Sequence, residues 1–199
     1  YNWMKVHEQE MYSQLFEDIE NLKPVIPAGS SDSAALDSVF ELLNISGQPA
    51  PLAKLMLIPD AWSKKSKTLS KDHQQLFNFL NSTMEPWDGP AAIAGTDNEW
   101  VIAATDRNGL RPMRYTITKD KILCAGSETG MVELDEKKII TKGRLGPGEI
   151  IGVRIEKGKV FTNSQIKDFL AKEYKHFNNQ IIELDKKLKI KNEKPIFSG

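Results

Sequence analysis

The chain has 199 residues, enough for one well-buried domain. Its 27 basic and 27 acidic residues balance, so no overall field attracts nucleic acid, anionic lipid or an acidic partner. No apolar run reaches the roughly 18–20 residues that span a bilayer, and the single cysteine, Cys124, excludes an internal disulfide and a self-contained thiolate cluster. We therefore expect a soluble cytoplasmic protein that binds neither nucleic acid nor membrane and has no metal site.

The first half of the chain carries helical patterns. Apolar residues at mixed helical spacings predict an amphipathic helix over residues 3–18. A second helix is predicted after the cluster of serines at residues 30–33, a short third helix after Pro51, and a fourth between Ser70 and Pro86. The stripe that defines the second helix is Leu36, Val39, Phe40 and Leu43. The lysine-rich stretch between the third and fourth helices is expected to be a solvated loop.

After Pro90 the pattern changes to short apolar runs separated by turns. Asp97-Asn98 predicts one hairpin turn and residues 119–121 predict another. Further strands follow, with glycine turns at residues 146–148 and at Gly158, and a charged helix returns from Ser164. Helices followed by antiparallel strands predict an α+β layered domain.

Asp32 stands at the predicted start of the second helix, and two roles are open to it. Aspartate and serine cap helices because a side-chain oxygen accepts from amides that the first turn leaves unpaired. The stretch offers four candidate caps: Ser30, Ser31, Asp32 and Ser33. A carboxylate here could equally pair with a substrate ammonium group while a neighbouring serine caps the helix.

Two later motifs have structural interpretations of their own. MEPWDGPA, residues 84–91, reads as a rigid connector with Trp87 packed on the core. DRNGLRPMRY, residues 106–115, combines a strong turn dipeptide with three arginines, which suit either a carboxylate ligand or an ion-pair network. Cys124 lies among apolar residues with no base nearby, so we expect a core residue rather than a nucleophile.

Taken together and in order, these motifs resemble the amidotransferase domain of the glutamate synthase large subunit, a class II glutamine amidotransferase. The resemblance rests on GSSDSAALD (29–37), MEPWDGPA (84–91) and DRNGLRPMRY (106–115), with support from NWM (2–4), LMLIPDAW (55–62), KGRLGPGE (142–149) and KPIFSG (194–199). MEPWDGPA is typical of glutamate synthase, whereas DRNGLRP is shared more loosely with other class II enzymes such as amidophosphoribosyltransferase.

The resemblance implies an N-terminal nucleophile fold, a four-layer αββα sandwich that is incomplete here, with its first strands missing. In the family an N-terminal cysteine attacks the glutamine amide, its own amino group acts as base, and an Asn-Gly pair stabilises the oxyanion. This chain begins with Tyr1 and lacks these groups and the family's carboxylate-binding arginine, so no catalytic residue is assigned and the isolated fragment is expected to be inactive. A non-catalytic binding or scaffold module with this fold is the alternative from another class.

By resemblance, Asp32 matches the carboxylate that pairs with the α-ammonium of glutamine, and Ser31 helps to shape that loop. Residues expected to scaffold the neighbourhood of the site are Asp106, Arg107, Asn108, Gly109 and Arg111. Residues 1–163 are expected to form the partial amidotransferase domain, and residues 164–199 a helical extension and linker toward the synthase region.

The parent enzyme would make L-glutamate from glutamine and 2-oxoglutarate. Its FMN, iron-sulfur cluster and NADPH or ferredoxin are expected to bind outside this segment. Expected partners are glutamine, the other domains of the large subunit, and a small subunit as a further candidate.

Overall fold

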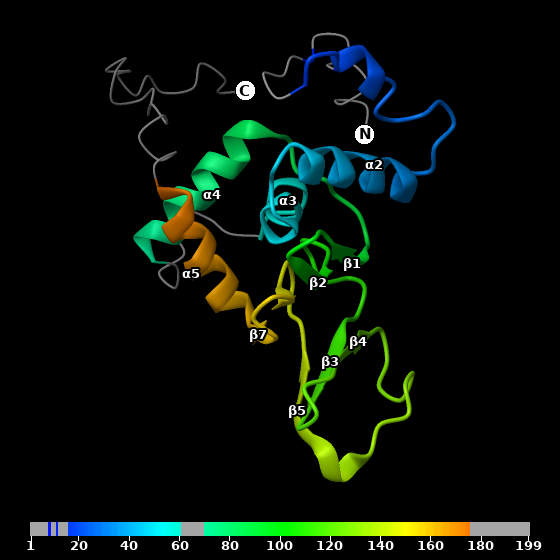
Figure 1. Ribbon diagram of the computed structural model, residues 1–199, viewed down its shortest axis with the longest axis vertical. Helices are drawn as coiled ribbons and strands as arrows, with labels where there is room; N and C mark the ends of the chain where they lie inside the picture. The colour runs from blue at the N-terminus through cyan, green and yellow to red at the C-terminus, as the bar shows by residue number, and fades with distance from the viewer. Residues whose placement is uncertain (1–7, 9–10, 12–15, 61–69, 176–199) are drawn as a thin grey trace, which may run out of the picture.

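The computed structural model describes residues 8, 11, 16–60 and 70–175 (Figure 1). The helix predicted over residues 3–18, most of the lysine-rich loop and the tail after residue 175 lie largely outside this part of the chain. The helical elements are η2 (Ile19–Leu22), α2 (Asp32–Ile45), α3 (Ala50–Leu57), α4 (Lys71–Thr83), η3 (Glu136–Lys138) and α5 (Asn163–Glu173). The strands are β1 (Ala92–Thr96), β2 (Trp100–Thr105), β3 (Arg114–Thr118), β4 (Leu123–Gly126), β5 (Ile139–Arg144), β6 (Ile150–Arg154) and β7 (Lys159–Phe161).

The predicted helices α2, α3 and α4 are confirmed, and each begins with a feature visible in the sequence. Ser31 and Ser70 cap α2 and α4 by accepting hydrogen bonds from Ala34 N and His73 N. Pro51 lies in the first turn of α3, where its missing N–H costs no helical hydrogen bond. α4 ends before Met84, which is extended and lies two residues ahead of Pro86.

The strands form two antiparallel sheets. The larger has the order β1-β2-β6-β7, and the smaller has the order β4-β3-β5. Asp97 closes the β1–β2 hairpin, because its Oδ1 accepts from the amides of Glu99 and Trp100, each at 2.6 Å. The hairpins predicted at Asp97-Asn98 and at residues 119–121 are therefore confirmed.

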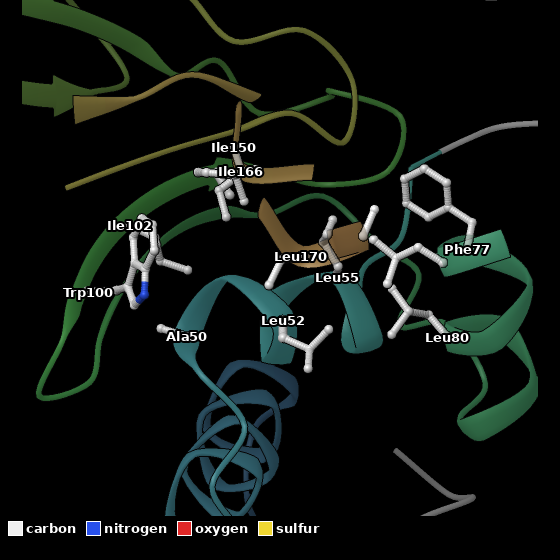
Figure 2. Close-up of a cluster of buried hydrophobic side chains, with 13 residues drawn as sticks. Ala50, Leu52, Leu55, Phe77, Leu80, Trp100, Ile102, Ile150, Ile166 and Leu170 are labelled. Atoms are coloured by element: carbon white, nitrogen blue, oxygen red, sulfur yellow. The ribbon is translucent and has the colours of Figure 1, made fainter. Parts of the chain in front are cut away.

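The main core lies between the larger sheet and helices α3, α4 and α5 (Figure 2). Trp100 occupies one end of it, with the ring of Phe161 edge-on at 5.1 Å and the ring of Phe169 at 5.7 Å between centroids. The buried residues are Ala50, Leu52, Leu55, Leu76, Phe77, Leu80, Trp100, Ile102, Ala104, Ile150, Ile166, Leu170 and Ala171. Helix α5 thus contributes to the same core as the helices from the first half of the chain.

Helix α2 forms a second cluster with α3 and with Val25 and Ile26. It approaches β1 at Gly95, where an added Cβ would lie 3.0 Å from the Phe40 ring. A glycine in the strand therefore lets the helix pack close to the sheet edge at Phe40.

The smaller sheet extends away from the α-helices (Figure 1). A third cluster joins it to the larger sheet through Met113 and Leu145 from the ends of its strands, and Ala103 and Ile151 from β2 and β6. The mixture of helices with antiparallel sheets confirms the predicted α+β class. Within the described residues, no helix has the length and apolar character needed to cross a membrane.

Candidate functional site

Asp32 is the first residue of α2, and Ser31 is its N-cap. The Ser31 hydroxyl accepts from Ala34 N at 3.2 Å and lies 3.2 Å from the Ser33 hydroxyl. No hydrogen bond of the Asp32 carboxylate is found among the described residues, and the side chain is exposed. A carboxylate in the first turn is favoured by the helix dipole, but the capping bond is made by Ser31, so the Asp32 carboxylate is available to a ligand.

Replacing Ser31 with alanine is expected to destabilise α2 by about 1 kcal/mol, because the Ala34 amide loses its acceptor. The measurement is the change in the free energy of unfolding of the chain in urea. Ser38→Ala is the matched control, since the Ser38 hydroxyl only donates to a carbonyl inside the helix. Equal effects of the two substitutions would contradict a capping role for Ser31.

Asp32 lines an open groove of about 530 Å³, which we call the Asp32 groove. One wall comes from α2 with Ser33, Leu36 and Val39, and the other from residues 84–91. The second wall is tied to the helices, because Trp87 N donates to Leu57 O at 2.6 Å. The structure thus brings together two segments that sequence analysis treated as separate motifs.

Asp106 fastens the end of the second wall to the larger sheet. Its amide donates to Ala91 O at 2.9 Å, and its carboxylate accepts from Ala91 N at 3.3 Å. The same carboxylate accepts from the amides of Asn108, Leu110 and Arg111 at 3.0–3.1 Å. Since Ala91 lines the Asp32 groove, Asp106 lies directly behind it.

The surroundings of Asp106 favour its ionised form. The residue is only 2% exposed, and burial by itself raises the pKa of a carboxyl group. The four amide donors outweigh burial, so that the pKa of Asp106 lies below its ordinary value. An acceptor that is charged at neutral pH therefore organises the turn over residues 107–111.

The other residues of this motif lie in that turn. Gly109 has a φ of +64° and its Cα faces Pro147, so a Cβ there would come within 3.0 Å of the proline. Arg107 is half-buried, and Asn108 and Arg111 are exposed. None of these four residues is among those that line the Asp32 groove.

Sequence analysis missed a buried cluster of charges behind the same region. Lys54 on α3 is 1% exposed, and its Nζ donates to Gly148 O at 2.6 Å. Gly148 N in turn donates to Asp106 O at 2.8 Å. The signal in the sequence was a lysine inside the apolar helix APLAKLML, which is unusual because lysine is rarely buried without a partner.

The pKa of Lys54 is lowered from 10.5 to about 8, chiefly by burial and in part by nearby Lys167, while Asp60, Asp106 and Glu149 oppose the shift. Lys167 from α5 donates to Asp60 Oδ2, whereas Asp60 Oδ1 is buried without a hydrogen-bond partner. Gly148 has a φ of +70°, and a Cβ there would lie 3.0 Å from Asp60 Cα. Helices α3 and α5 are therefore joined to the sheet by charged groups as well as by the apolar core.

No grouping of three or more His, Cys, Asp or Glu side chains suited to a metal ion occurs in the described parts of the chain. Cys124 is half-buried on β4. A cluster with four cysteine ligands could not be held by this chain's one cysteine.

A family model for class-II glutamine amidotransferases matches residues 1–179. The chain belongs to this family. It is 53% identical over 171 residues to the glutamate synthase [NADPH] large chain of Azospirillum brasilense, covering 85% of this chain and 11% of that protein.

Two further relatives carry related names. The chain is 39% identical over 189 residues to glutamate synthase [NADH] of Saccharomyces cerevisiae, and the alignment covers 92% of this chain and 9% of that protein. It is 40% identical over 178 residues to ferredoxin-dependent glutamate synthase 2 of Synechocystis, and this alignment covers 87% of this chain and 11% of that protein. The chain thus spans about a tenth of the length of these relatives.

Proposed function

We propose that this chain is part of the glutamine-hydrolysing domain of a glutamate synthase, and that it contributes to L-glutamate synthesis from glutamine and 2-oxoglutarate. The observation that carries the proposal is the Asp32 groove, in which a carboxylate without a hydrogen-bond partner among the described residues lies opposite residues 84–91. Membership of the class II amidotransferase family and the names of the relatives support it.

In this proposal Asp32 binds the α-ammonium group of glutamine. A charge-assisted hydrogen bond of this kind contributes roughly 1.5–3 kcal/mol, which would favour an amino acid over a simple amide. Ser31 keeps the loop in place by capping α2. Asp106, Arg107, Asn108, Gly109 and Arg111 would act as scaffold, with Asp106 holding Ala91 at the end of the groove.

The test is Asp32→Asn in the complete enzyme that carries this chain. The KM for glutamine is expected to rise about 10- to 100-fold, the equivalent of the lost contact at about 1.4 kcal/mol per tenfold, while ammonia-dependent glutamate synthesis is retained. Asp37→Asn is the matched control, because Asp37 is exposed on the same helix and does not line the Asp32 groove.

Two results would count against this role for Asp32. An equal loss of the glutamine-dependent and ammonia-dependent activities would indicate a folding role. An unchanged KM for glutamine would show that the carboxylate does not contact the substrate.

We further propose that the larger sheet is one of the two central sheets of an αββα sandwich. Helices cover one face of it, whereas Val101 and three residues of β1, Ala92, Ala94 and Thr96, are exposed on strands β1 and β2. A second sheet from elsewhere in a longer polypeptide would cover these residues. The division of the chain at residue 163 stays a prediction, and α5, which begins there, packs into the main core.

The remaining parts of the proposal concern the parent enzyme. FMN and an iron-sulfur cluster would be bound by its other domains, and the electron donor would be NADPH, NADH or ferredoxin, each of which occurs in a relative's name. A cytoplasmic location and contacts with the other domains of the large subunit or with a small subunit belong to the same proposal.

A further inference from the structure

The smaller sheet carries an unusual pair of like charges. Arg114 on β3 lies directly opposite Arg144 on β5 in the antiparallel register, and Lys142 lies opposite Thr116 one pair further along. Residues two apart on a strand share a face, so all three cations project from the same side. Like charges directly opposite each other destabilise a sheet.

No carboxylate compensates the two arginines among the described residues. The ion pairs of the described chain include Lys142 with Glu136, at 3.8 Å, but neither Arg114 nor Arg144. Glu128 and Arg114 line the same small cavity, yet no ion pair joins them. Both arginines are exposed.

Protection of a sheet edge does not account for this pair. Cations on an edge strand commonly prevent strands of other molecules from pairing with it, and this explains Lys142 and Arg144 on β5. β3, however, is the central strand of the smaller sheet, so Arg114 has no edge to protect.

Apolar side chains accompany the cations. Ile122, Met131, Val132 and Ile140, all in the smaller sheet or its connections, are between 48% and 65% exposed. The sheet also lies apart from the α-helices (Figure 1). Arginine and methionine, both present here, are enriched at protein interfaces relative to the rest of the surface.

We propose that this face of the smaller sheet, which we call the Arg114–Arg144 face, docks against a carboxylate-bearing surface elsewhere in the same, longer polypeptide. The guanidinium groups of two directly opposite arginines suit bidentate pairing with carboxylates, which would turn a repulsive pair into an attractive one. The proposal rests on the chain being part of a larger enzyme, as expected from relatives of which it spans about a tenth.

The test asks whether neutralising the two arginines makes amide hydrogen exchange faster or slower in the complete polypeptide. Amide hydrogen exchange of β3 and β5 is compared between the wild type and Arg114→Gln/Arg144→Gln. If the face is docked, neutralisation removes the contact, and exchange is expected to become about tenfold faster. If nothing acidic covers the face, neutralisation only relieves repulsion, so slower or unchanged exchange would overturn the proposal.

Lys119→Gln/Lys121→Gln is the matched control, because these exposed lysines belong to the turn of the same sheet and are not on the Arg114–Arg144 face. Exchange in β3 and β5 of this variant is expected to match the wild type. An equal acceleration would show that the lost charge, rather than the face, is responsible.

A second measurement needs no variant and holds even if the double variant fails to fold. Raising the salt from about 0.1 M to about 1 M shortens the Debye length from about 10 Å to about 3 Å. Faster exchange in wild-type β3 and β5 supports docking, whereas slower or unchanged exchange contradicts it. Exchange that slows with protein concentration would place a second copy on the face and overturn the assignment. Because no readout uses glutamine, failure of Asp32 as a ligand would leave this test intact.

Discussion

Replacement of Asp106 by alanine is expected to lower the free energy of unfolding by about 3–4 kcal/mol. The change leaves four backbone amides without their acceptor, and an unsatisfied buried donor costs about 1–3 kcal/mol, part of which water can restore. Ala91 N is among these donors, so the wall of the Asp32 groove should loosen as well. Urea denaturation of the chain, followed by tryptophan fluorescence, measures the effect.

Asp120→Ala is the control for this prediction. Asp120 makes a half-exposed ion pair with Lys138 at 2.7 Å, and such pairs contribute about 0–1 kcal/mol. A loss for Asp106→Ala no larger than for Asp120→Ala would show that the turn over residues 107–111 forms without the carboxylate.

Asp106→Ala should also change how the stability of the protein responds to acid. Because the folded pKa of Asp106 is lowered, its ionised form stabilises the protein above the unfolded value, about pH 4. This contribution is lost as the pH falls through the folded pKa. The wild type should therefore lose more stability than Asp106→Ala when the pH is lowered below about 4. Parallel losses would contradict the amide hydrogen bonds to the ionised carboxylate.

Replacement of Lys54 by methionine is expected to remove a large increase in the free energy of unfolding that the wild type shows as the pH rises above about 8. The pKa of Lys54 falls from 10.5 to about 8 on folding, and at about 1.4 kcal/mol per pKa unit this corresponds to roughly 3 kcal/mol. Above pH 8 the folded protein releases the proton while the unfolded chain keeps it. Stability attributable to Lys54 therefore rises with pH up to 10.5.

The measurement is the difference in unfolding free energy between wild type and Lys54→Met at about pH 7 and at about pH 10.5. The wild type is expected to gain roughly 3 kcal/mol relative to the variant over this range. Lys119→Met, which changes an exposed lysine, should show no such difference. Parallel curves for wild type and Lys54→Met would mean that the buried amine is already neutral or is solvated.

The elements that sequence analysis predicted correctly are those specified by neighbouring residues. The stripe of α2, the proline in the first turn of α3 and the Asp97-Asn98 turn each depend on contacts within a few residues. The role of Asp32 was harder to predict, because four adjacent residues could cap the helix. Only the backbone geometry selects Ser31 as the cap.

Features that depend on distant pairing could not be read from the pattern. Lys54 meets a carbonyl 94 residues away, and its helix has the same apolar periodicity whether the lysine is buried or exposed. Likewise, the opposition of Arg114 and Arg144 requires the register of β3 with β5, which a bulge at Ile117/Thr118 alters locally. The groove itself requires α2 and residues 84–91 to be placed side by side.

The peptide at Gly148 has a consequence for how the length of the chain can vary. Its N–H and C=O bind Asp106 and Lys54, and its Cα lies against Asp60. Insertion or deletion of one residue between Leu145 and Ile150 would displace all of these partners together. Natural variants of different length should therefore avoid this turn and accumulate instead in the exposed turn between β6 and β7, residues 155–158.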